Sequence, residues 1–307
     1  MPKLAFIFPG QGSQYPGMGK ELAENFEEAA RVFNQADEII GYDLSKLCFE
    51  GPEEKLNQTE FAQPALLAAS LAAFEVLKKH GISAAIMAGL SLGEYSALVA
   101  SGALDLKEAL PLVRTRARLM QDAVPAGKGA MAAVVGLDTS AVEDTCSRVD
   151  GIVAIANYNC PGQVVISGQK EAVGEATVLL KEQGGRVVPL AISVPSHSRL
   201  MYEAALKLQP YLEKAAWREG KVGVVSNVNA RENEASGFPD LLVKQLFSPV
   251  LWEQSVRYMM EKVDYFIEVG PGSSLSGLVK KIDRSRVIGQ VGDLKSLQKT
   301  IEKVGTL

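Results

Sequence analysis

Short apolar runs alternate with amphipathic segments over residues 1–124 of the chain. The runs have the length of buried strands, and between them apolar residues recur at helical spacing. Within Ala62–Lys79, for example, Ala65, Leu66, Ala69 and Val76 share one broad face. Such alternation is typical of a parallel α/β sheet. It predicts, in chain order, a strand over 3–8, helices over 20–40 and 62–79, a strand over 84–89, and helices over 92–101 and 106–124.

Between residues 125 and 197 the pattern changes to strands and helices in the order β-α-β-β-α-β. This order is that of a ferredoxin-like unit. We therefore expect a small ferredoxin-like subdomain, 125–197, inserted in the larger domain. Its elements are predicted over 130–135, 139–149, 152–156, 164–167, 171–183 and 186–192.

After residue 199 the α/β alternation resumes. Strands are predicted near 222–228, 265–269 and 286–291. The expected fold is therefore an α/β protein whose large parallel-sheet core consists of 1–124 and 198–307.

Composition narrows the class of protein. Of the 307 residues, 47% are apolar and 22% are charged, which is ordinary for a globular protein, and the net charge of −4 argues against a nucleic-acid binder. No apolar run approaches the roughly 20 residues that span a bilayer, and the run at 4–8 is too short for a signal sequence. The odd number of cysteines, without metal-type spacing, fits reduced thiols in a cytoplasmic protein.

The segment Gly89-Leu90-Ser91-Leu92-Gly93 has the form G-x-S-x-G. Chance supplies this pattern in about one chain in ten of this length, so the motif alone is weak. Its context is more specific, because an apolar strand precedes it and a helix rich in alanine and leucine follows it. That order is the strand–turn–helix of a nucleophile elbow, whose helix N-terminus offers amide donors to an oxyanion. Ser91 is therefore predicted to be a nucleophile; an idle serine in a tight turn is the alternative.

A serine nucleophile needs a general base, and histidine is the usual one near neutral pH. The chain has 2 histidines. His80 ends the helix before the strand that leads to Ser91, so it should lie at the far end of that strand, as a cation near a helix C-terminus. His197 lies where the small subdomain returns to the core, and a cleft is expected at such a junction. We therefore predict that His197 is the base, with an ordinary polar loop residue as the alternative.

The glycine-rich loop 9–14 follows the first strand but does not fit a nucleotide site. The third glycine of G-x-G-x-x-G would fall at Tyr15, and Lys20 lacks the neighbours of a P-loop lysine. A better use of the loop is to donate a backbone amide, from Gln11, to an oxyanion hole beside Leu92.

Arg116 is unusual on its predicted helix. It falls about 60° from the centre of the helix's apolar stripe, whereas Arg114 and Arg118 project well away from it. An inward guanidinium needs an anionic partner because it cannot shed its charge. That partner is either an internal Asp or Glu or the carboxylate of a substrate. Spacing leaves both alternatives open.

A series of short motifs extends along nearly the whole chain in a fixed order. They are Pro9-Gly10-Gln11-Gly12-Ser13-Gln14, Gln63-Pro64-Ala65-Leu66, the Ser91 elbow with Gly93-Glu94-Tyr95-Ser96, Met120-Gln121-Asp122-Ala123-Val124-Pro125, Pro161-Gly162-Gln163-Val164-Val165, Val194-Pro195-Ser196-His197 and Glu268-Val269-Gly270-Pro271-Gly272. Together they resemble the malonyl-CoA:acyl carrier protein transacylases of dissociated fatty-acid synthesis.

The resemblance implies a function and an architecture. In that family the serine is acylated by malonyl-CoA, and the acyl group then passes to the phosphopantetheine thiol of acyl carrier protein, without a cofactor or a metal. The family has a hydrolase-like α/β core with a ferredoxin-like subdomain, and we expect a monomer. Carried over by position, Ser91 is the nucleophile, His197 the base and Arg116 the receptor of the malonyl carboxylate, while Gln11 and Leu92 supply the oxyanion-hole amides.

Two positions depart from the family pattern. The backbone carbonyl that orients the histidine is carried over to Leu251, where many relatives have Gln; a carbonyl does not depend on the side chain. Leu90 stands where the family usually has His before the serine, which makes the pocket wall less polar.

Three alternatives share much of this pattern. A hydrolase of the same fold would discharge the acyl-serine to water, and a polyketide-pathway transacylase would use the same chemistry. A docking module without catalysis would not need Ser91 and His197.

A partner that is acidic, as acyl carrier proteins are, needs a local basic patch on a chain of net charge −4. The densest cluster of cations contains Lys280, Lys281, Arg284 and Arg286, and we expect Lys280 and Lys281 to contact the carrier. A solvated helix end that complements the helix dipole is the alternative. Neither nucleic acid nor a membrane is expected as a partner.

Overall fold

The computed structural model describes residues 2–125, 127–191 and 194–307. Its larger sheet is 5-stranded, in the order β7-β2-β1-β8-β9, and every neighbouring pair runs parallel. Parallel neighbours require crossover connections, which the intervening helices supply. The strands are β1 (Leu4–Phe8), β2 (Ile86–Gly89), β7 (Gly223–Val225), β8 (Tyr265–Val269) and β9 (Val287–Val291).

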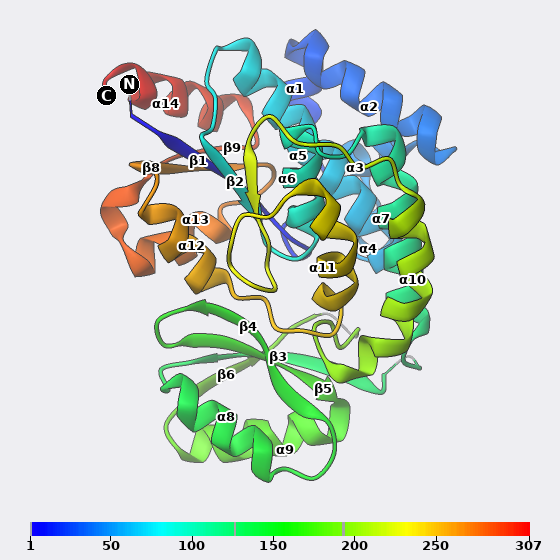
Figure 1. Cartoon of the computed structure of the whole chain (residues 1–307), viewed down its shortest axis with the longest axis vertical. Coiled ribbons are helices and arrows are strands. Elements are labelled where there is room, and N and C mark those ends of the chain that lie inside the picture. Colours follow the sequence, from blue (N-terminus) through cyan, green and yellow to red (C-terminus); the bar gives the residue numbers. More distant parts are fainter. Residues whose placement is uncertain (1, 126, 192–193) are drawn as a thin grey trace.

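Helices cover both faces of this sheet, which is why its strands are apolar runs without alternation. Phe6 and Phe8 of β1 face a large core that most of the helices share, whereas Ala5 and Ile7 face a smaller core. Figure 1 shows the sheet between these two layers. The large core includes α1 (Lys20–Asn25), α2 (Glu27–Ile40), α3 (Leu44–Glu50), α4 (Glu53–Leu56), α5 (Thr59–Lys79), α6 (Leu92–Ser101), α7 (Leu106–Asp122), α10 (Tyr202–Lys214), α11 (Phe238–Gln245) and α14 (Leu294–Gly305), and the smaller one α12 (Trp252–Met260) and α13 (Ser274–Ile282).

The second sheet is 4-stranded and antiparallel, in the order β4-β5-β3-β6. Its chain order and strand order are those of a ferredoxin-like unit, in which each βαβ connection leaves room for a strand between its two strands. Val134 and Ile166 lie on the face that the helices cover, while Met131 and Val165 lie on the other face. The elements are β3 (Gly129–Val135), α8 (Thr139–Arg148), β4 (Val153–Cys160), β5 (Gln163–Gln169), α9 (Lys170–Glu182) and β6 (Arg186–Pro189).

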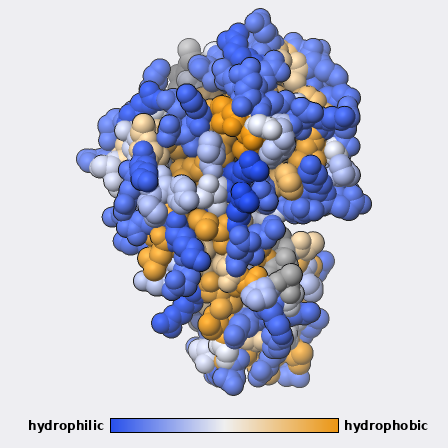
Figure 2. All heavy atoms as spheres, turned by 90° about the vertical axis from the view of Figure 1, so that its right-hand side faces the viewer, coloured by the Kyte–Doolittle hydropathy of each residue, from blue (hydrophilic) through white to orange (hydrophobic). Residues whose placement is uncertain are grey.

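The small sheet is attached to the core along β4. The amide of Tyr158 donates to the carbonyl of Val250 at 2.9 Å, and the amide of Val250 donates to the carbonyl of Ala156 at 2.8 Å. Figure 2 shows the wider body that holds the parallel sheet above the narrower one that holds the antiparallel sheet, with the outline drawn in between them. The face of the small sheet that has no helices therefore points toward the core.

The expected α/β architecture is confirmed, and most element boundaries agree within a few residues. The helix expected over 20–40 is two helices, because Phe26 adopts an extended conformation between them. The strand expected over 222–228 stops at Val225, and the chain then turns back on itself. The strand expected over 186–192 ends at Pro189, and residue 192 lies outside the described residues. The exact limits of the subdomain, 125 and 197, stay a prediction.

Helix α5 corrects one expectation about membranes. By length and composition alone it could cross a bilayer, although polar residues interrupt its apolar runs. However, 78% of its most apolar 18-residue stretch is buried inside the protein, where the helix packs against α2 and α7. The helix is thus a core helix whose apolar residues are mostly covered by protein.

Candidate active site

Ser91 lies on a sharp turn between β2 and α6. Its φ of 54° is in the left-handed region that non-glycine residues rarely adopt. Glycine is required at the two flanking positions, 89 and 93, because other backbone atoms approach them closely. A Cβ on Gly89 would lie 1.9 Å from the carbonyl carbon of Gly93, and a Cβ on Gly93 would lie 2.1 Å from the carbonyl oxygen of Phe8. The G-x-S-x-G pattern therefore specifies a strained elbow packed against β1.

His197 meets Ser91 from a distant part of the chain. Its Nε2 lies 2.8 Å from Oγ of Ser91, and its Nδ1 lies 2.7 Å from the carbonyl oxygen of Gln245. Because a carbonyl can only accept, Nδ1 carries the proton and Nε2 is free to accept one from Ser91. Burial, together with the charge of Arg116, lowers the pKa of His197 to about 4. The imidazole is therefore neutral and able to act as a base at physiological pH.

The carbonyl that orients His197 belongs to Gln245, and the expectation that it belongs to Leu251 is wrong. The carbonyl of Leu251 accepts hydrogen bonds from the amide and hydroxyl of Ser255 at 2.9 and 2.8 Å, because Leu251 is the N-cap of α12. The amide of Leu251 donates to the carbonyl of Asn227. Gln245 is the last residue of α11, so its carbonyl is not committed within the helix.

The two amides expected to form the oxyanion hole both line the cavity beside Ser91. The amide of Ser91 itself is occupied, since it donates to Oδ1 of Asn227 at 2.6 Å. In the part of the chain that the structure describes, neither the amide of Leu92 nor that of Gln11 has an acceptor. Leu92 is the first residue of α6, where the helix dipole also favours negative charge. This arrangement is compatible with the predicted roles of Gln11 and Leu92, which stay predictions.

Arg116 points inward, as its place on the stripe predicts, and is 0% exposed. Its Nη1 donates to Oε1 of Gln63 at 2.8 Å, and its Nη2 donates to Oε1 of Gln245 at 3.0 Å. Nη2 also donates to Oγ of Ser91 at 3.1 Å, and the ring of Tyr95 lies 5.5 Å from the guanidinium carbon. The cation thus touches the same hydroxyl oxygen as the base.

The described residues do not support the first alternative for the partner of Arg116, an internal carboxylate. Among the described residues, Arg116 forms no ion pair with any Asp or Glu. Burial lowers the pKa of its guanidinium, whereas Tyr95 and Glu94 act in the opposite direction. Guanidinium groups keep their charge even when buried, so this one is available to an anion from outside.

Glu94, Gln245 and Asn227 form a buried network that sequence reasoning missed. Oε2 of Glu94 accepts from Nε2 of Gln245 at 2.7 Å and from the amide of Asn227 at 3.1 Å. Gln245 also donates to the carbonyl of Ser91 at 3.0 Å, and Asn227 donates to the carbonyl of Gly89 at 2.7 Å. Burial raises the pKa of Glu94 to about 7, although these hydrogen bonds and Arg116 oppose the rise. The network holds the elbow from two sides.

Two of these residues carried a signal that could have been found. Gln245 lies on the buried stripe of α11 with Phe238 and Leu242, as Arg116 lies on the stripe of α7. Glu94 is the only charged residue of the apolar helix α6. Asn227 had no comparable signal, because its place depends on where the chain turns after β7.

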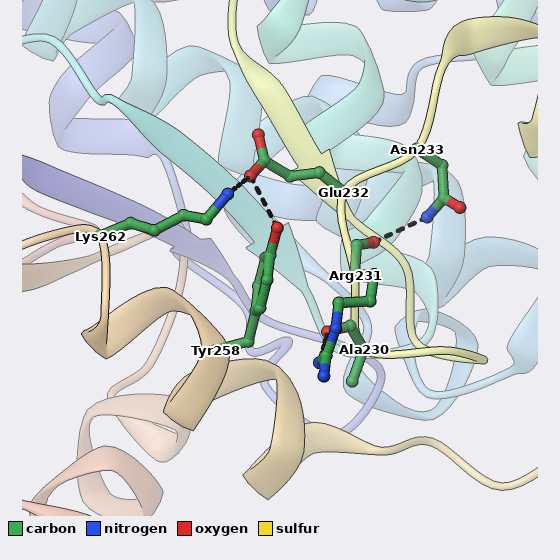
Figure 3. Close-up of polar contacts among 6 residues, drawn as sticks. All are labelled: Ala230, Arg231, Glu232, Asn233, Tyr258 and Lys262. Atoms are coloured by element: carbon green, nitrogen blue, oxygen red, sulfur yellow. Dashed lines mark hydrogen bonds and ion pairs between the residues drawn. The ribbon is translucent and has the colours of Figure 1, made fainter.

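The loop that carries Asn227 is anchored at the edge of the sheet. After β7 the chain turns back at Ala230, whose φ is 53°, and the amide of Ser226 donates to the carbonyl of Arg231 at 2.9 Å. Figure 3 shows Glu232 pointing to the hydroxyl of Tyr258, at 3.1 Å, and to the amino group of Lys262. These contacts tie the loop to α12 and to the turn that follows it, and fix the position from which Asn227 reaches the elbow.

The cavity beside Ser91 has a volume of about 340 Å³ and lies between the core and the small sheet. The core contributes the loop with Gln11, the elbow, His197 and the first turns of α13. The small sheet contributes its helix-free face, including Met131, Asn157 and Val165. Apolar walls with a few polar groups are typical of sites for organic ligands.

Lys280 and Lys281 are exposed at the end of α13. Nζ of Lys281 donates to Oε1 of Gln163, which lines the cavity, so this lysine is close to the rim. Their predicted contact with a partner stays a prediction. Within the described ranges, no group of His, Cys, Asp and Glu residues could hold a metal ion.

The comparisons with known proteins agree with this geometry. The model of the acyl transferase domain family matches residues 5–304. A malonyl CoA-acyl carrier protein transacylase of Bacillus subtilis is 47% identical over 98% of this chain and 97% of its own. The solved structure of a malonyl CoA-acyl carrier protein transacylase from Clostridium perfringens has a TM-score of 0.96 at 44% identity, covering 99% of this chain and 98% of that one.

A malonyl transacylase solved in complex with a type II polyketide synthase acyl carrier protein has a TM-score of 0.95 at 44% identity, covering 98% of this chain and 99% of that one. The similarity spans both the parallel core and the inserted antiparallel sheet, so it confirms the expected fold. The chain belongs to the malonyl CoA-acyl carrier protein transacylase family.

Proposed function

We propose that the chain transfers a malonyl group from coenzyme A to the phosphopantetheine thiol of acyl carrier protein, through an ester on Ser91, in fatty-acid synthesis. The position of Arg116 is the observation that carries the proposal. Its Nη2 is 3.1 Å from Oγ of Ser91, and it forms no ion pair with a carboxylate of the described residues. In a malonyl ester the free carboxylate is two carbon–carbon bonds beyond the ester carbonyl, so an acyl group on Oγ would bring it next to this guanidinium.

The first half-reaction forms the acyl-enzyme. His197 Nε2 takes the proton from Ser91 as Oγ attacks the thioester carbonyl. The amides of Gln11 and Leu92 receive the oxyanion. The carbon–sulfur bond then breaks, and His197 returns the proton to the sulfur of coenzyme A.

The second half-reaction repeats these steps with the carrier's thiol as the nucleophile. His197 takes the thiol proton, the sulfur attacks the ester on Ser91, and the proton returns to Oγ as the serine is released. Because the thioester supplies the activated acyl group, we propose that no cofactor takes part. The three cysteines are free and buried, which supports a reducing cytoplasmic location.

Mass spectrometry of the intact protein tests the proposal. After brief exposure to malonyl-CoA, the wild type should gain one malonyl group on Ser91, and acyl carrier protein should remove it. Ser91→Ala should gain none, and His197→Ala should load at least about 10²-fold more slowly, the lower range for a positioned base. Full loading of Ser91→Ala would overturn the assignment.

The same experiment separates the two enzyme alternatives. A hydrolase would lose the malonyl mass to water in buffer, at the rate of its turnover and without a carrier. A transacylase of polyketide synthesis would give the same acyl-enzyme but discharge faster to a polyketide carrier than to a fatty-acid carrier. The complex with a polyketide carrier protein in a related enzyme makes this comparison worthwhile.

The docking of the carrier is a separate part of the proposal. Lys280→Glu combined with Lys281→Glu should raise the KM for acyl carrier protein and flatten its salt dependence, because rim charges act mainly on encounter. Malonyl loading from coenzyme A should stay near that of the wild type. Normal transfer to the carrier at low salt would place the docking surface elsewhere.

A further inference from the structure

We infer that Gln63 and Gln245 set the acyl specificity of the site, because they hold Arg116 through neutral amide oxygens and leave its charge for the substrate. The inference rests on the proposed function and deepens it. A buried guanidinium paired with a carboxylate of the protein would already be neutralised. The carboxylate of the acyl group would then have to displace that partner, and selection for it would be lost.

Gln63 holds Arg116 from the side of the cavity. It is 1% exposed, and its Oε1 accepts from Nη1 of Arg116 at 2.8 Å. Its Nε2 faces Oε1 of Gln11 at 3.4 Å, in the loop expected to form the oxyanion hole. The amide is thus oriented by an acceptor on one side and a donor on the other, so that its oxygen faces the cation.

Gln245 binds the other terminal nitrogen of Arg116 and also bonds to Glu94. Its Oε1 accepts from Nη2 of Arg116 at 3.0 Å, while its Nε2 donates to the Glu94 carboxylate at 2.7 Å. The Glu94 carboxyl group is therefore bonded to the amide of Gln245, and among the described residues it forms no ion pair with the guanidinium of Arg116. Gln245 keeps the two opposite charges apart although both are 0% exposed.

The packing of α5 against α7 could accommodate a carboxylate at position 63 with little rearrangement. Glu60 lies one turn before Gln63 on the same helix and does pair with an arginine of α7, at 3.3 Å from Arg114. The helix pair α5–α7 therefore accommodates Arg–Glu pairs, and the amide at position 63 is what distinguishes the buried pair from the outer one.

The test is Gln63→Glu, which keeps the size and shape of the side chain. Gln11 can accommodate the new oxygen by turning its amide, since its other partner is the hydroxyl of Thr59, which can donate or accept. We expect kcat/KM for malonyl loading of Ser91 to fall at least about 30-fold, the lower range for a lost contact between buried charges. Acetyl loading should fall by less than about threefold, because an acetyl group has no carboxylate that competes with the introduced one for Arg116.

Loading is followed by intact mass after rapid quenching, at several concentrations of malonyl-CoA or acetyl-CoA, without a carrier protein. The malonyl loss should appear mainly in the KM for malonyl-CoA, because the substrate carboxylate competes with the introduced one. An equal fall in the maximal rates of both substrates would indicate a structural defect and overturn the inference.

Two controls separate pairing with Arg116 from a general repulsion. Gln163→Glu adds the same charge to a residue that lines the same cavity but contacts Lys281, and it should reduce malonyl loading much less. In an Arg116→Ala background, Gln63→Glu should change malonyl loading by less than about threefold, because its target is gone. A full effect in that background would overturn the inference.

The outcomes also distinguish this inference from the proposed function. If the wild type loads neither malonyl nor acetyl on Ser91, the proposed function fails. If it loads both and Gln63→Glu keeps the wild-type preference for malonyl, only the role of the two glutamines fails.

Discussion

Helix α7 carries one inner arginine, Arg116, and two outer ones, Arg114 and Arg118, which differ in burial and in the groups that they contact. Arg114 and Arg118 are 35% and 62% exposed, and both pair with Glu60, at 3.3 and 3.5 Å. Arg116 is 0% exposed and has two amides and a hydroxyl as its partners. Exposed ion pairs contribute little stability, whereas a buried cation without an anion is costly. This costly arrangement is found at Arg116, next to Ser91, where a cation is needed to bind the carboxylate of the acyl group.

Removing the inner guanidinium should produce the largest effect. Arg116→Ala should lower malonyl loading by about 30-fold to several thousand-fold, which corresponds to about 2–5 kcal/mol for a contact between buried charges. Acetyl loading should fall less, or rise. Arg114→Ala is the matched control on the outer face and should leave both rates close to those of the wild type. Equal losses for malonyl and acetyl would make Arg116 a structural residue.

The buried carboxyl group near Arg116 should affect stability. Burial raises the pKa of Glu94 to about 7 from its usual 4.5, so its contribution to stability is full below pH 4.5 and declines as the pH rises toward 7. Glu94→Gln keeps the acceptor oxygen without the charge. Its free energy of unfolding should exceed that of the wild type by up to about 3 kcal/mol at pH 8 and by under about 1 kcal/mol at pH 5.

Urea denaturation at the two pH values measures this difference, and Glu60→Gln serves as the control on the outer face. A variant less stable than the wild type at pH 8 would show that the hydrogen bonds of the charged form outweigh the cost of its burial.

The loss of acetyl loading at low pH should also respond differently to removal of Arg116 and of Arg114. Burial first, and then Arg116, lower the pKa of His197 to about 4, so acetyl loading should persist well below pH 6.5 and fail near pH 4. The acetyl substrate is chosen because it leaves Arg116 unneutralised. In Arg116→Ala this loss should move to higher pH, whereas in Arg114→Ala it should stay where it is in the wild type. An unchanged loss in both would mean that burial alone sets the pKa.

The outer ion pairs should give the smallest effect. Glu60→Gln removes the partner of Arg114 and Arg118, yet the free energy of unfolding should fall by less than about 1 kcal/mol, and less still in high salt. Thermal or urea unfolding at two salt concentrations measures it. A loss of several kcal/mol would remove the contrast between the two faces of α7.

Much of the fold and part of the site could be predicted from local patterns. The strand–turn–helix context identified the elbow, because the glycines at positions 89 and 93 are required by backbone contacts that no other residue permits. The inward position of Arg116 followed from the 3.6-residue period of its helix. The break at Phe26 was missed, because the apolar period continues across it.

The sequence by itself determined which residue types are present and which faces they occupy: an elbow serine, one histidine at a domain junction, and an arginine on an apolar stripe. Only the tertiary structure decided which groups meet. Gln245 comes 154 residues after Ser91, and its carbonyl, not that of Leu251, holds His197. Whether Arg116 pairs with a carboxylate or with amides depends on the packing of α5, α7 and α11. Helical period fixes the direction of a side chain but not its partner, because the partner belongs to another element whose distance and rotation are set by the whole core.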